Sequence, residues 1–119
     1  RAAGAGIGAF FCPTSYGTPL AEGKETREID GRNYVLEYPI KGDVALIHAE
    51  TADKMGNLVY RKTARNFAPV MATASTRTIV EVNNVVEVGE LDPENIVTPK
   101  IYTDDVLDLS ALPKEETAA

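Results

Sequence analysis

The chain has 119 residues, of which 44% are hydrophobic and 25% charged, as in one soluble globular domain. Twelve basic and 18 acidic residues give a net charge of −6 and a pI near 4.7, which disfavours nucleic acid as a partner because phosphates are repelled. No apolar run approaches the roughly 20 residues that cross a bilayer, so the sequence predicts no membrane partner. A single cysteine excludes an internal disulfide, which predicts a cytoplasmic protein, with the mitochondrial matrix as the alternative.

The first half of the chain is typical of short strands separated by turns. The apolar run 7–12 predicts a strand that Pro13 stops. Alternating polar and apolar residues on both sides of Asp30-Gly31 predict a hairpin, because a type I′ turn needs a positive φ at both central positions. The run 43–50 has four consecutive apolar residues between charged ones and predicts a buried strand.

The second half predicts one helix, over 67–74, with Pro69 tolerated in its first turn. A short helical turn is expected near Asp92. Further strands are expected at 58–60, 77–82, 83–89 (or a continuation of the one before) and 100–109. The sequence therefore predicts an α/β fold, an open mixed sheet with few short helices, in a domain over 1–109. A polar, mobile tail is expected at 110–119.

The opening glycines have the spacing of a dinucleotide-binding turn, with Gly4, Gly6 and Ala9 in the pattern. The context does not fit, because only three residues precede Gly4, and two aromatic residues and Pro13 stand where a helix is needed. We interpret these glycines as positions where two backbones approach closely in a turn at a sheet edge. Because the chain opens without methionine in this apolar segment, we expect it to be a piece of a larger protein.

Few side chains are candidates for chemistry. Cys12 is a candidate nucleophile, but we favour a small buried side chain at this position. His48 is a candidate base, but we favour a strand residue whose ring nitrogens have hydrogen-bond partners. A catalytic dyad of Cys12 and His48 is left open. The acidic group Asp104, Asp105 and Asp108 is a candidate for a hard cation, and a solvated rim is the favoured interpretation. No metal site is assigned.

Basic residues cluster at Arg61, Lys62 and Arg65, three positive charges within five residues of an acidic chain. Such a cluster fits the phosphates of a ligand or an acidic patch on a partner. Pairing with acids of the same chain is an equally good interpretation. Because no complete catalytic set is found, the chain is either a binding module or one part of a site completed by another polypeptide.

Long stretches between Gly4 and Val106 resemble, in the same order, the first subunit of family I coenzyme A transferases. The nearest branch is the 3-oxoacid (succinyl-CoA:acetoacetate) type, with the 3-oxoadipate type close to it. The resemblance implies that the chain is the C-terminal half of that first subunit. It rests on the stretches GAGIGAFFCPTSYGTPLAEGKE, ALIHAETADKMGNLVYRKTARNFAPVM and VEVGELDPENIVTPKIYTDDV.

The resemblance implies transfer of CoA from an acyl-CoA to a carboxylic acid through a glutamyl-CoA thioester, with CoA as substrate and no other cofactor. The family's catalytic glutamate lies in a Ser-Glu-Asn-Gly motif on the second subunit. Here Pro93 and Ile96 flank Glu94-Asn95, so no catalytic residue is assigned to this chain. The implied partners are the second subunit, which carries the catalytic glutamate, and the N-terminal half of the first, without which the chain is inactive. The alternative is a non-catalytic assembly module.

For substrate binding, we expect the loop after the first strand to wall the acyl pocket against the second subunit, because ligands of open α/β sheets lie at the carboxyl ends of strands. The expected contacts are Phe11, Thr14 and Tyr16, supported by Asn66 and Phe67. A purely structural place in the core is the favoured alternative for the two phenylalanines.

The sequence departs from the family at three positions. Gly8 stands where proline is frequent, Cys12 where threonine is frequent and Ala68 where asparagine is frequent. A cysteine at a position where threonine suffices argues against a nucleophilic Cys12, so a stand-alone thiol enzyme is the weakest of the three hypotheses.

Overall fold

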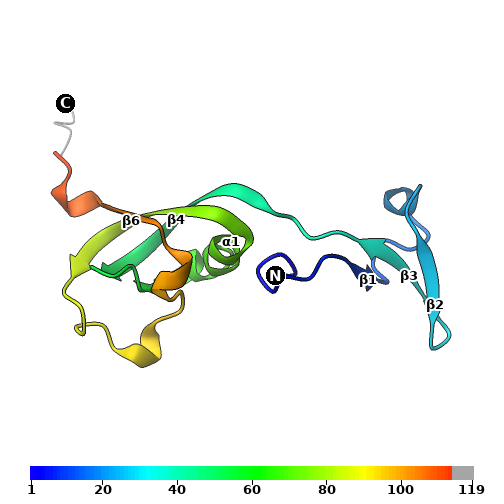
Figure 1. The fold of residues 1–119 in the computed structure, drawn as a ribbon, viewed down its shortest axis with the longest axis horizontal. Helices are drawn as coiled ribbons and strands as arrows, with labels where there is room; N and C mark the ends of the chain where they lie inside the picture. Colours follow the sequence, from blue (N-terminus) through cyan, green and yellow to red (C-terminus); the bar gives the residue numbers. More distant parts are fainter. Residues whose placement is uncertain (114–119) are drawn as a thin grey trace.

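The computed structural model describes residues 1–113 and shows an elongated molecule with two separate sheets (Figure 1). Its extents are 58 × 40 × 24 Å and its radius of gyration is 19.1 Å. A compact domain of this length has a radius of gyration of about 13–14 Å. A small sheet, here called the arm (residues 10–37), projects from a larger part, here called the body (residues 42–113), which holds a second sheet and helix α1.

The arm is a three-stranded antiparallel sheet in the order β1-β3-β2. Its strands are β1 (Phe10–Cys12), β2 (Thr26–Ile29) and β3 (Arg32–Glu37). Asp30 and Gly31, with φ of 49° and 74°, form the tight turn between β2 and β3 and confirm the predicted hairpin. Among the strand residues of the arm, Val35 alone is buried. The arm therefore has almost no core of its own.

The body contains a four-stranded sheet in the order β5-β4-β6-β7. Its strands are β4 (Gly42–Asp53), β5 (Leu58–Val59), β6 (Ser75–Val86) and β7 (Asp105–Asp108). Strands β4, β6 and β7 are parallel, and β5 is antiparallel to β4. Helix α1 (Ala68–Ala74) precedes β6 and has Pro69 in its first turn, as predicted. The predicted fold class, α/β with an open mixed sheet and few short helices, is confirmed, whereas the separate sheet of the arm was not predicted. Residues 83–86 continue β6.

Five short 3-10 helices complete the described chain: η1 (Pro19–Ala21), η2 (Lys62–Arg65), η3 (Pro93–Asn95), η4 (Lys100–Tyr102) and η5 (Leu109–Ala111). The turn expected near Asp92 is η3, which the Asp92 carboxylate caps by accepting from the Glu94 N–H at 3.0 Å. The expected tail begins inside η5, and its residues 114–119 lie outside the described part. Among the described residues, no helix is long and apolar enough to cross a membrane.

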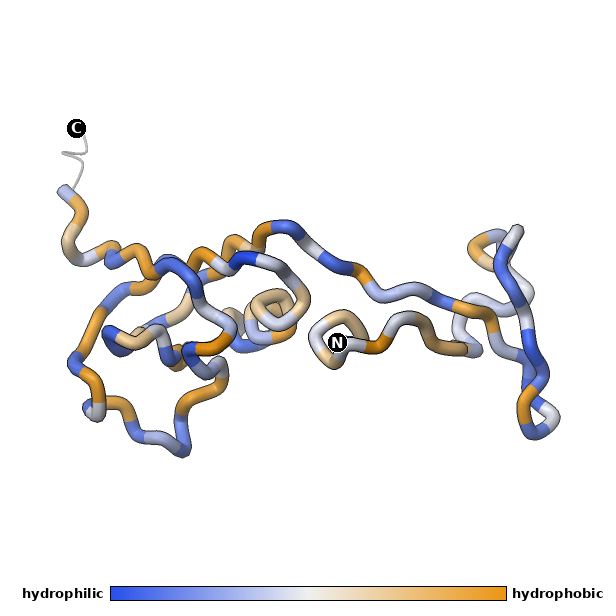
Figure 2. The backbone as a smooth tube through the Cα atoms, in the orientation of Figure 1, coloured by the Kyte–Doolittle hydropathy of each residue, from blue (hydrophilic) through white to orange (hydrophobic). Residues whose placement is uncertain are grey.

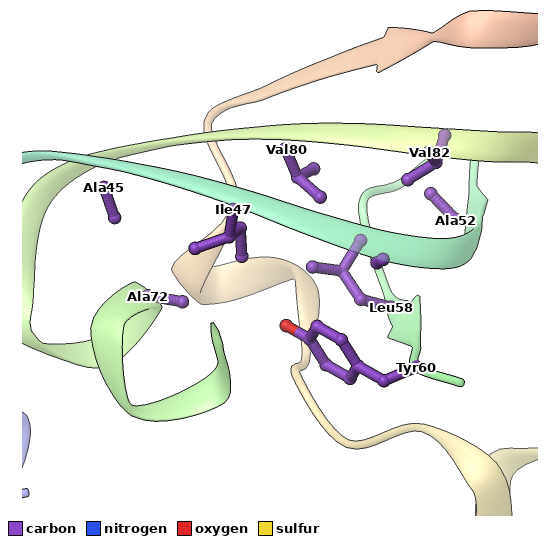
Figure 3. Close-up of a cluster of buried hydrophobic side chains, with 9 residues drawn as sticks. Ala45, Ile47, Ala52, Leu58, Tyr60, Ala72, Val80 and Val82 are labelled. Atoms are coloured by element: carbon purple, nitrogen blue, oxygen red, sulfur yellow. The ribbon is translucent and has the colours of Figure 1, made fainter. Parts of the chain in front are cut away.

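The hydrophobic core lies in the body, between its sheet, α1 and the chain after β5 (Figure 3). Leu58, Val80 and Val82 are fully buried. The Tyr60 hydroxyl enters this core and shares a 2.7 Å hydrogen bond with Thr98 Oγ1. Burial raises the pKa of Tyr60, although the bond to Thr98 opposes that shift. Figure 2 shows that apolar residues also lie along the arm and the linking segment, so they do not gather in a single centre.

Strand β4 corrects one prediction. The sequence predicts burial throughout the apolar run 43–50, yet its side chains alternate between the two faces of the sheet. Ala45, Ile47 and Ala49 are buried, whereas the Leu46 side chain is 71% exposed. The physical reason is that α1 covers only one face, and a run of consecutive apolar residues does not show whether the second face is covered.

The opening glycines form a turn that packs on α1. The turn is closed by the Ala5 N–H bond to Arg1 O at 3.0 Å and the Ile7 N–H bond to Ala2 O at 2.9 Å. A Cβ atom added at Gly4 would lie 2.1 Å from Thr73 Oγ1. The close backbone approach is therefore real, but its partner is a helix, and the predicted sheet-edge turn is wrong.

Replacing Gly4 by alanine is expected to destabilise the chain by about 1–3 kcal/mol, because the new methyl group overlaps Thr73 in the helix. Urea unfolding of the variant measures this. Gly8→Ala is the matched control, since nothing lies within 4 Å of an added Cβ at that position. Equal stability of the two variants would show that the turn does not depend on contact with α1.

Candidate functional site

The loop that follows β1, residues 13–17, is held by three side chains that we call the Glu37 cluster: Ser15, Lys24 and Glu37. The buried Ser15 hydroxyl donates to Glu37 Oε1 at 2.8 Å. Lys24 Nζ lies 3.0 Å from Oε1 and 2.8 Å from Oε2 of the same carboxylate. The cluster therefore ties the loop to the end of β3 and to the chain after η1.

Charge in the Glu37 cluster is balanced. The hydrogen bond from Lys24, and then that from Ser15, holds the pKa of Glu37 below its ordinary value. Glu37 is thus a carboxylate at neutral pH and a weak proton acceptor. Nearby, Cys12 Sγ contacts Thr14 Oγ1 at 3.2 Å, and hydrogen bonding to Thr14 lowers the pKa of the thiol. Cys12 is only half-buried, so the expected buried side chain is not what the structure shows.

A cavity of about 580 Å³ lies beside this cluster, between the arm and the N-terminal turn. Its lining includes polar residues, Arg1, Cys12, Thr14, Glu37 and Tyr38, and apolar ones such as Phe10 and Ile40. We call it the arm cavity. Its mixture of hydroxyl, thiol, carboxylate and apolar groups suits a small molecule that has both polar and apolar parts.

In the body, the sheet face that α1 leaves uncovered carries Leu46, Ile79 and Leu107 around a polar pair, and we call it the open face. His48 Nδ1 lies 3.3 Å from Glu81 Oε1 on the neighbouring strand. A hollow of about 380 Å³ lies over these side chains. His48 is thus a strand residue with a partner, as expected, and that partner is Glu81 rather than Cys12 of the other sheet.

A second hollow of the body, of about 280 Å³, lies where η2 and α1 meet β4. Asn66 and Phe67 line it together with Leu46 and His48. The Phe67 side chain is 67% exposed, so the core interpretation is wrong for this residue. Phe67 stands just before α1, where it lines this hollow and lies outside the hydrophobic core.

Residues 1–109 match the family model described as coenzyme A transferase. The chain belongs to the coenzyme A transferase family. It is 63% identical over 109 residues to the first subunit of 3-oxoadipate CoA-transferase from Pseudomonas putida, a match that covers 92% of this chain and 47% of that protein. It is 54% identical over 115 residues to the first subunit of succinyl-CoA:3-ketoacid coenzyme A transferase from Xanthomonas campestris pv. campestris, a match that covers 97% of this chain and 47% of that protein.

The fold of this CoA-transferase chain is found in solved relatives. An acyl-CoA transferase from E. coli O157:H7, crystallised as a thioester complex with CoA, superposes with a TM-score of 0.77 at 22% identity over 95% of this chain and 26% of that chain. The chain spans about half the length of the curated relatives it matches. The resemblance to the first subunit of this family is confirmed, and relatives of both the 3-oxoadipate and the 3-ketoacid kind match.

The structure divides the predicted substrate contacts of the CoA-transferase chain between two regions. Phe11, Thr14 and Tyr16 lie on the arm, where Thr14 lines the arm cavity. Phe11 is half-buried, with the Arg27 guanidinium 4.6 Å from its ring centre. The other two contacts, Asn66 and Phe67, line the hollow beside α1. That all five touch substrate stays a prediction.

The other candidate groups have structural partners. Asp104 accepts from the Thr78 N–H at 2.7 Å, and Asp108 accepts from the Ser110 N–H at 2.9 Å. Asp105 pairs with Arg77. Among residues 1–113, no three His, Cys, Asp or Glu side chains are grouped as metal ligands. The acidic group is therefore used in hydrogen bonds and an ion pair within the body.

The basic cluster differs from the acidic one. None of the carboxylates that the structure describes forms an ion pair with Arg61, Lys62 or Arg65. Pairing within the described chain is therefore not supported for these three cations.

The Glu37 cluster was not predicted from the sequence, because Ser15 and Lys24 lie 22 and 13 positions from Glu37 and no local pattern joins them.

Proposed function

We propose that the chain is part of a CoA-transferase that moves CoA from an acyl-CoA such as succinyl-CoA to a 3-oxoacid such as acetoacetate. The observation that carries the proposal is the 63% identity, over 92% of the chain, to a subunit of a protein named 3-oxoadipate CoA-transferase. The 54% identity to a succinyl-CoA:3-ketoacid transferase subunit favours the donor and the 3-oxoacid class. 3-Oxoadipate is the alternative acceptor.

The proposed chemistry uses a glutamate of the second subunit. Its carboxylate attacks the thioester carbonyl of succinyl-CoA and expels the CoA thiolate, which leaves a mixed anhydride of glutamate and succinate. The thiolate then attacks the glutamyl carbonyl of this anhydride, so that a glutamyl-CoA thioester forms and succinate leaves. Acetoacetate then takes the CoA by the reverse sequence and regenerates the carboxylate. This chain would supply walls of the acyl pocket, because its own Glu37 is neutralised by Lys24 and therefore unsuited to attack.

The proposed partners are the second subunit, with its catalytic glutamate, and the rest of the first subunit. The relatives are each named as one subunit of their enzyme and are about twice as long as this chain. Parallel sheets occur almost only with both faces covered. The open face around Leu46 and Leu107 therefore supports a second layer of polypeptide, for which we propose the remaining part of the first subunit.

A non-catalytic assembly module is the second candidate function. Its support is the elongated shape, with a radius of gyration of 19.1 Å, and the exposed apolar residues of the segment that links arm and body. Ile40 in that segment is 90% exposed. Such surface is typical of chains that are stabilised by their partners.

Substitution of Tyr16 or Asn66 separates the two candidates. In the complete two-subunit enzyme, we expect Tyr16→Ala and Asn66→Ala each to lower kcat/KM for succinyl-CoA or the acceptor acid about tenfold, the loss expected for one substrate contact. Asn33→Ala, on the exposed hairpin of the arm, is the control. If both variants keep the KM and kcat of the control, the pocket proposal is wrong and the chain is a scaffold.

A further inference from the structure

We propose that Glu37 is a positioning residue for the CoA-transfer reaction. By binding Ser15 and Lys24 together, it fixes the loop 13–17 so that Thr14 faces the arm cavity. The inference rests on the proposed function, in which this loop walls the acyl pocket. It assigns a role to a carboxylate that no sequence motif had singled out.

The loop turns about Ser15, and this residue is anchored twice. Its side-chain oxygen is held by Glu37, and its carbonyl oxygen accepts from the Thr18 hydroxyl at 2.7 Å and from the Thr18 N–H at 3.1 Å. Ser15 is only 8% exposed, whereas Tyr16 beside it is 46% exposed. A buried polar residue with satisfied hydrogen bonds fixes the loop, so that its neighbours can face outward.

Glu37 is well placed to act as this anchor. Its backbone is paired with Phe10 of β1 in the antiparallel sheet. The sheet therefore fixes the position of Glu37 independently of the loop. Both of its oxygens bind Lys24, and Oε1 also accepts from Ser15. Hydrogen bonds to an ionised group are roughly twice as strong as neutral ones. The anchor is therefore stronger than a bond between two neutral side chains.

The same contacts argue against a reactive role for the cluster. A carboxylate with an ammonium group on both oxygens is held as the anion and is a weak proton acceptor. The Ser15 hydroxyl is buried and directed at Glu37. The Thr14 side chain, one residue earlier, lines the cavity instead. Glu37 also lines this cavity, but its oxygens are engaged by Ser15 and Lys24, so we assign its effect to the position of the loop.

The test uses three variants in the complete two-subunit enzyme. Glu37→Met removes every acceptor for Ser15, whereas Glu37→Gln keeps a neutral one. Glu25→Gln is the matched control, because it breaks another ion pair of the arm, with Arg27, that does not touch the loop. We expect kcat/KM for succinyl-CoA to fall at least about tenfold in Glu37→Met, about threefold in Glu37→Gln and not at all in the control.

A second readout does not depend on activity. Hydrogen exchange at the Tyr16 and Thr18 amides, which bond Pro13 O and Ser15 O in the wild type, should become faster in Glu37→Met and remain unchanged in Glu25→Gln. Melting temperatures of the complete enzyme show whether any loss of activity reflects unfolding. We expect Glu37→Gln to have the melting temperature of the wild type but a lower kcat/KM.

The outcomes separate this inference from the proposed function. Unchanged exchange in Glu37→Met overturns the inference, as does faster exchange with kcat/KM equal to that of the control. The inference is also overturned if kcat/KM falls only in proportion to the melting temperature and Glu37→Gln loses as much kcat/KM as Glu37→Met. A wild-type complex that transfers no CoA refutes the proposed function and, with it, the role of Glu37 in catalysis. If exchange is nevertheless faster in Glu37→Met, the anchoring of the loop by Glu37 stands.

Discussion

Replacing Asp53 by alanine is expected to lower the free energy of unfolding by about 3 kcal/mol at neutral pH. The Asp53 side chain is 3% exposed at the end of β4. Its Oδ1 accepts from the N–H groups of Met55 and Asn57 at 3.0 and 2.9 Å, and its Oδ2 accepts from Asn57 Nδ2 at 2.7 Å. The substitution leaves three donors without their partner, in a turn where Gly56 is buried and Met55 is exposed.

The effect of Asp53 extends beyond its own turn. The Asn57 side chain that Asp53 orients accepts from the Lys100 N–H at 2.9 Å, and so connects the β4–β5 turn to η4. Gly56 within the turn lies against Thr103 from the same region. Loss of Asp53 is therefore expected to loosen two segments far apart in the sequence. Asp43→Ala, at the exposed opposite end of β4, is the control and should change stability by less than about 0.5 kcal/mol.

The pH dependence of stability provides an independent check on Asp53. Burial alone would raise its pKa, but the hydrogen bonds from Asn57, Met55 and Gly56 outweigh burial and lower it. The resulting stabilisation is complete above the ordinary pKa near 3.8 and is lost as the pH falls through the lowered native value. Urea unfolding between pH 2 and pH 7 should show a shallower loss of stability on acidification in Asp53→Asn than in the wild type. Parallel pH profiles for the two proteins would contradict this account.

Replacing Leu46 by arginine is expected to leave the stability of the chain alone unchanged but to destabilise the complete enzyme. In the 119-residue chain alone, the side chain is 71% exposed, so the free energy of unfolding should change by less than about 0.5 kcal/mol. In the complete enzyme, where we propose that the open face is covered, a guanidinium would be buried among Ile79 and Leu107. The complete enzyme should then lose about 3 kcal/mol or more of stability.

Val88→Arg is the control for the open face, because Val88 is an exposed apolar residue that follows β6 and lies outside that face. It should be neutral both in the chain alone and in the complete enzyme. Denaturant unfolding of the four combinations measures the contrast. If Leu46→Arg is also neutral in the complete enzyme, the open face is not covered by the rest of the first subunit.

Elements with local causes could be predicted from the sequence. The Asp30-Gly31 turn follows from the positive φ that a tight hairpin needs, and the start of α1 from the fixed φ of Pro69. The exposure of Leu46 could not be predicted, because it depends on what covers the second face of the sheet. The contact of Gly4 with Thr73 joins segments that no periodicity relates.

The candidate site is predictable from the sequence only in part. Its place at the carboxyl end of the first strand singles out the loop after β1, which does line a cavity through Thr14. The sequence does not point to Glu37, whose partners come from two other segments of the arm. Asn66 and Phe67 are expected to support the same pocket, yet they line a hollow of the body beside α1. Such arrangements depend on three-dimensional proximity, which spacing along the chain does not encode.

The central claim, that this chain serves a CoA-transferase whose reactive glutamate lies on a partner, is tested most directly by intact-mass measurement of the complete enzyme after incubation with succinyl-CoA. We predict CoA in thioester linkage on the second subunit, none on this chain, and discharge to acetoacetyl-CoA when acetoacetate is added. Unmodified polypeptides with unchanged succinyl-CoA would contradict the claim. So would CoA or an acyl group attached to Cys12 of this chain.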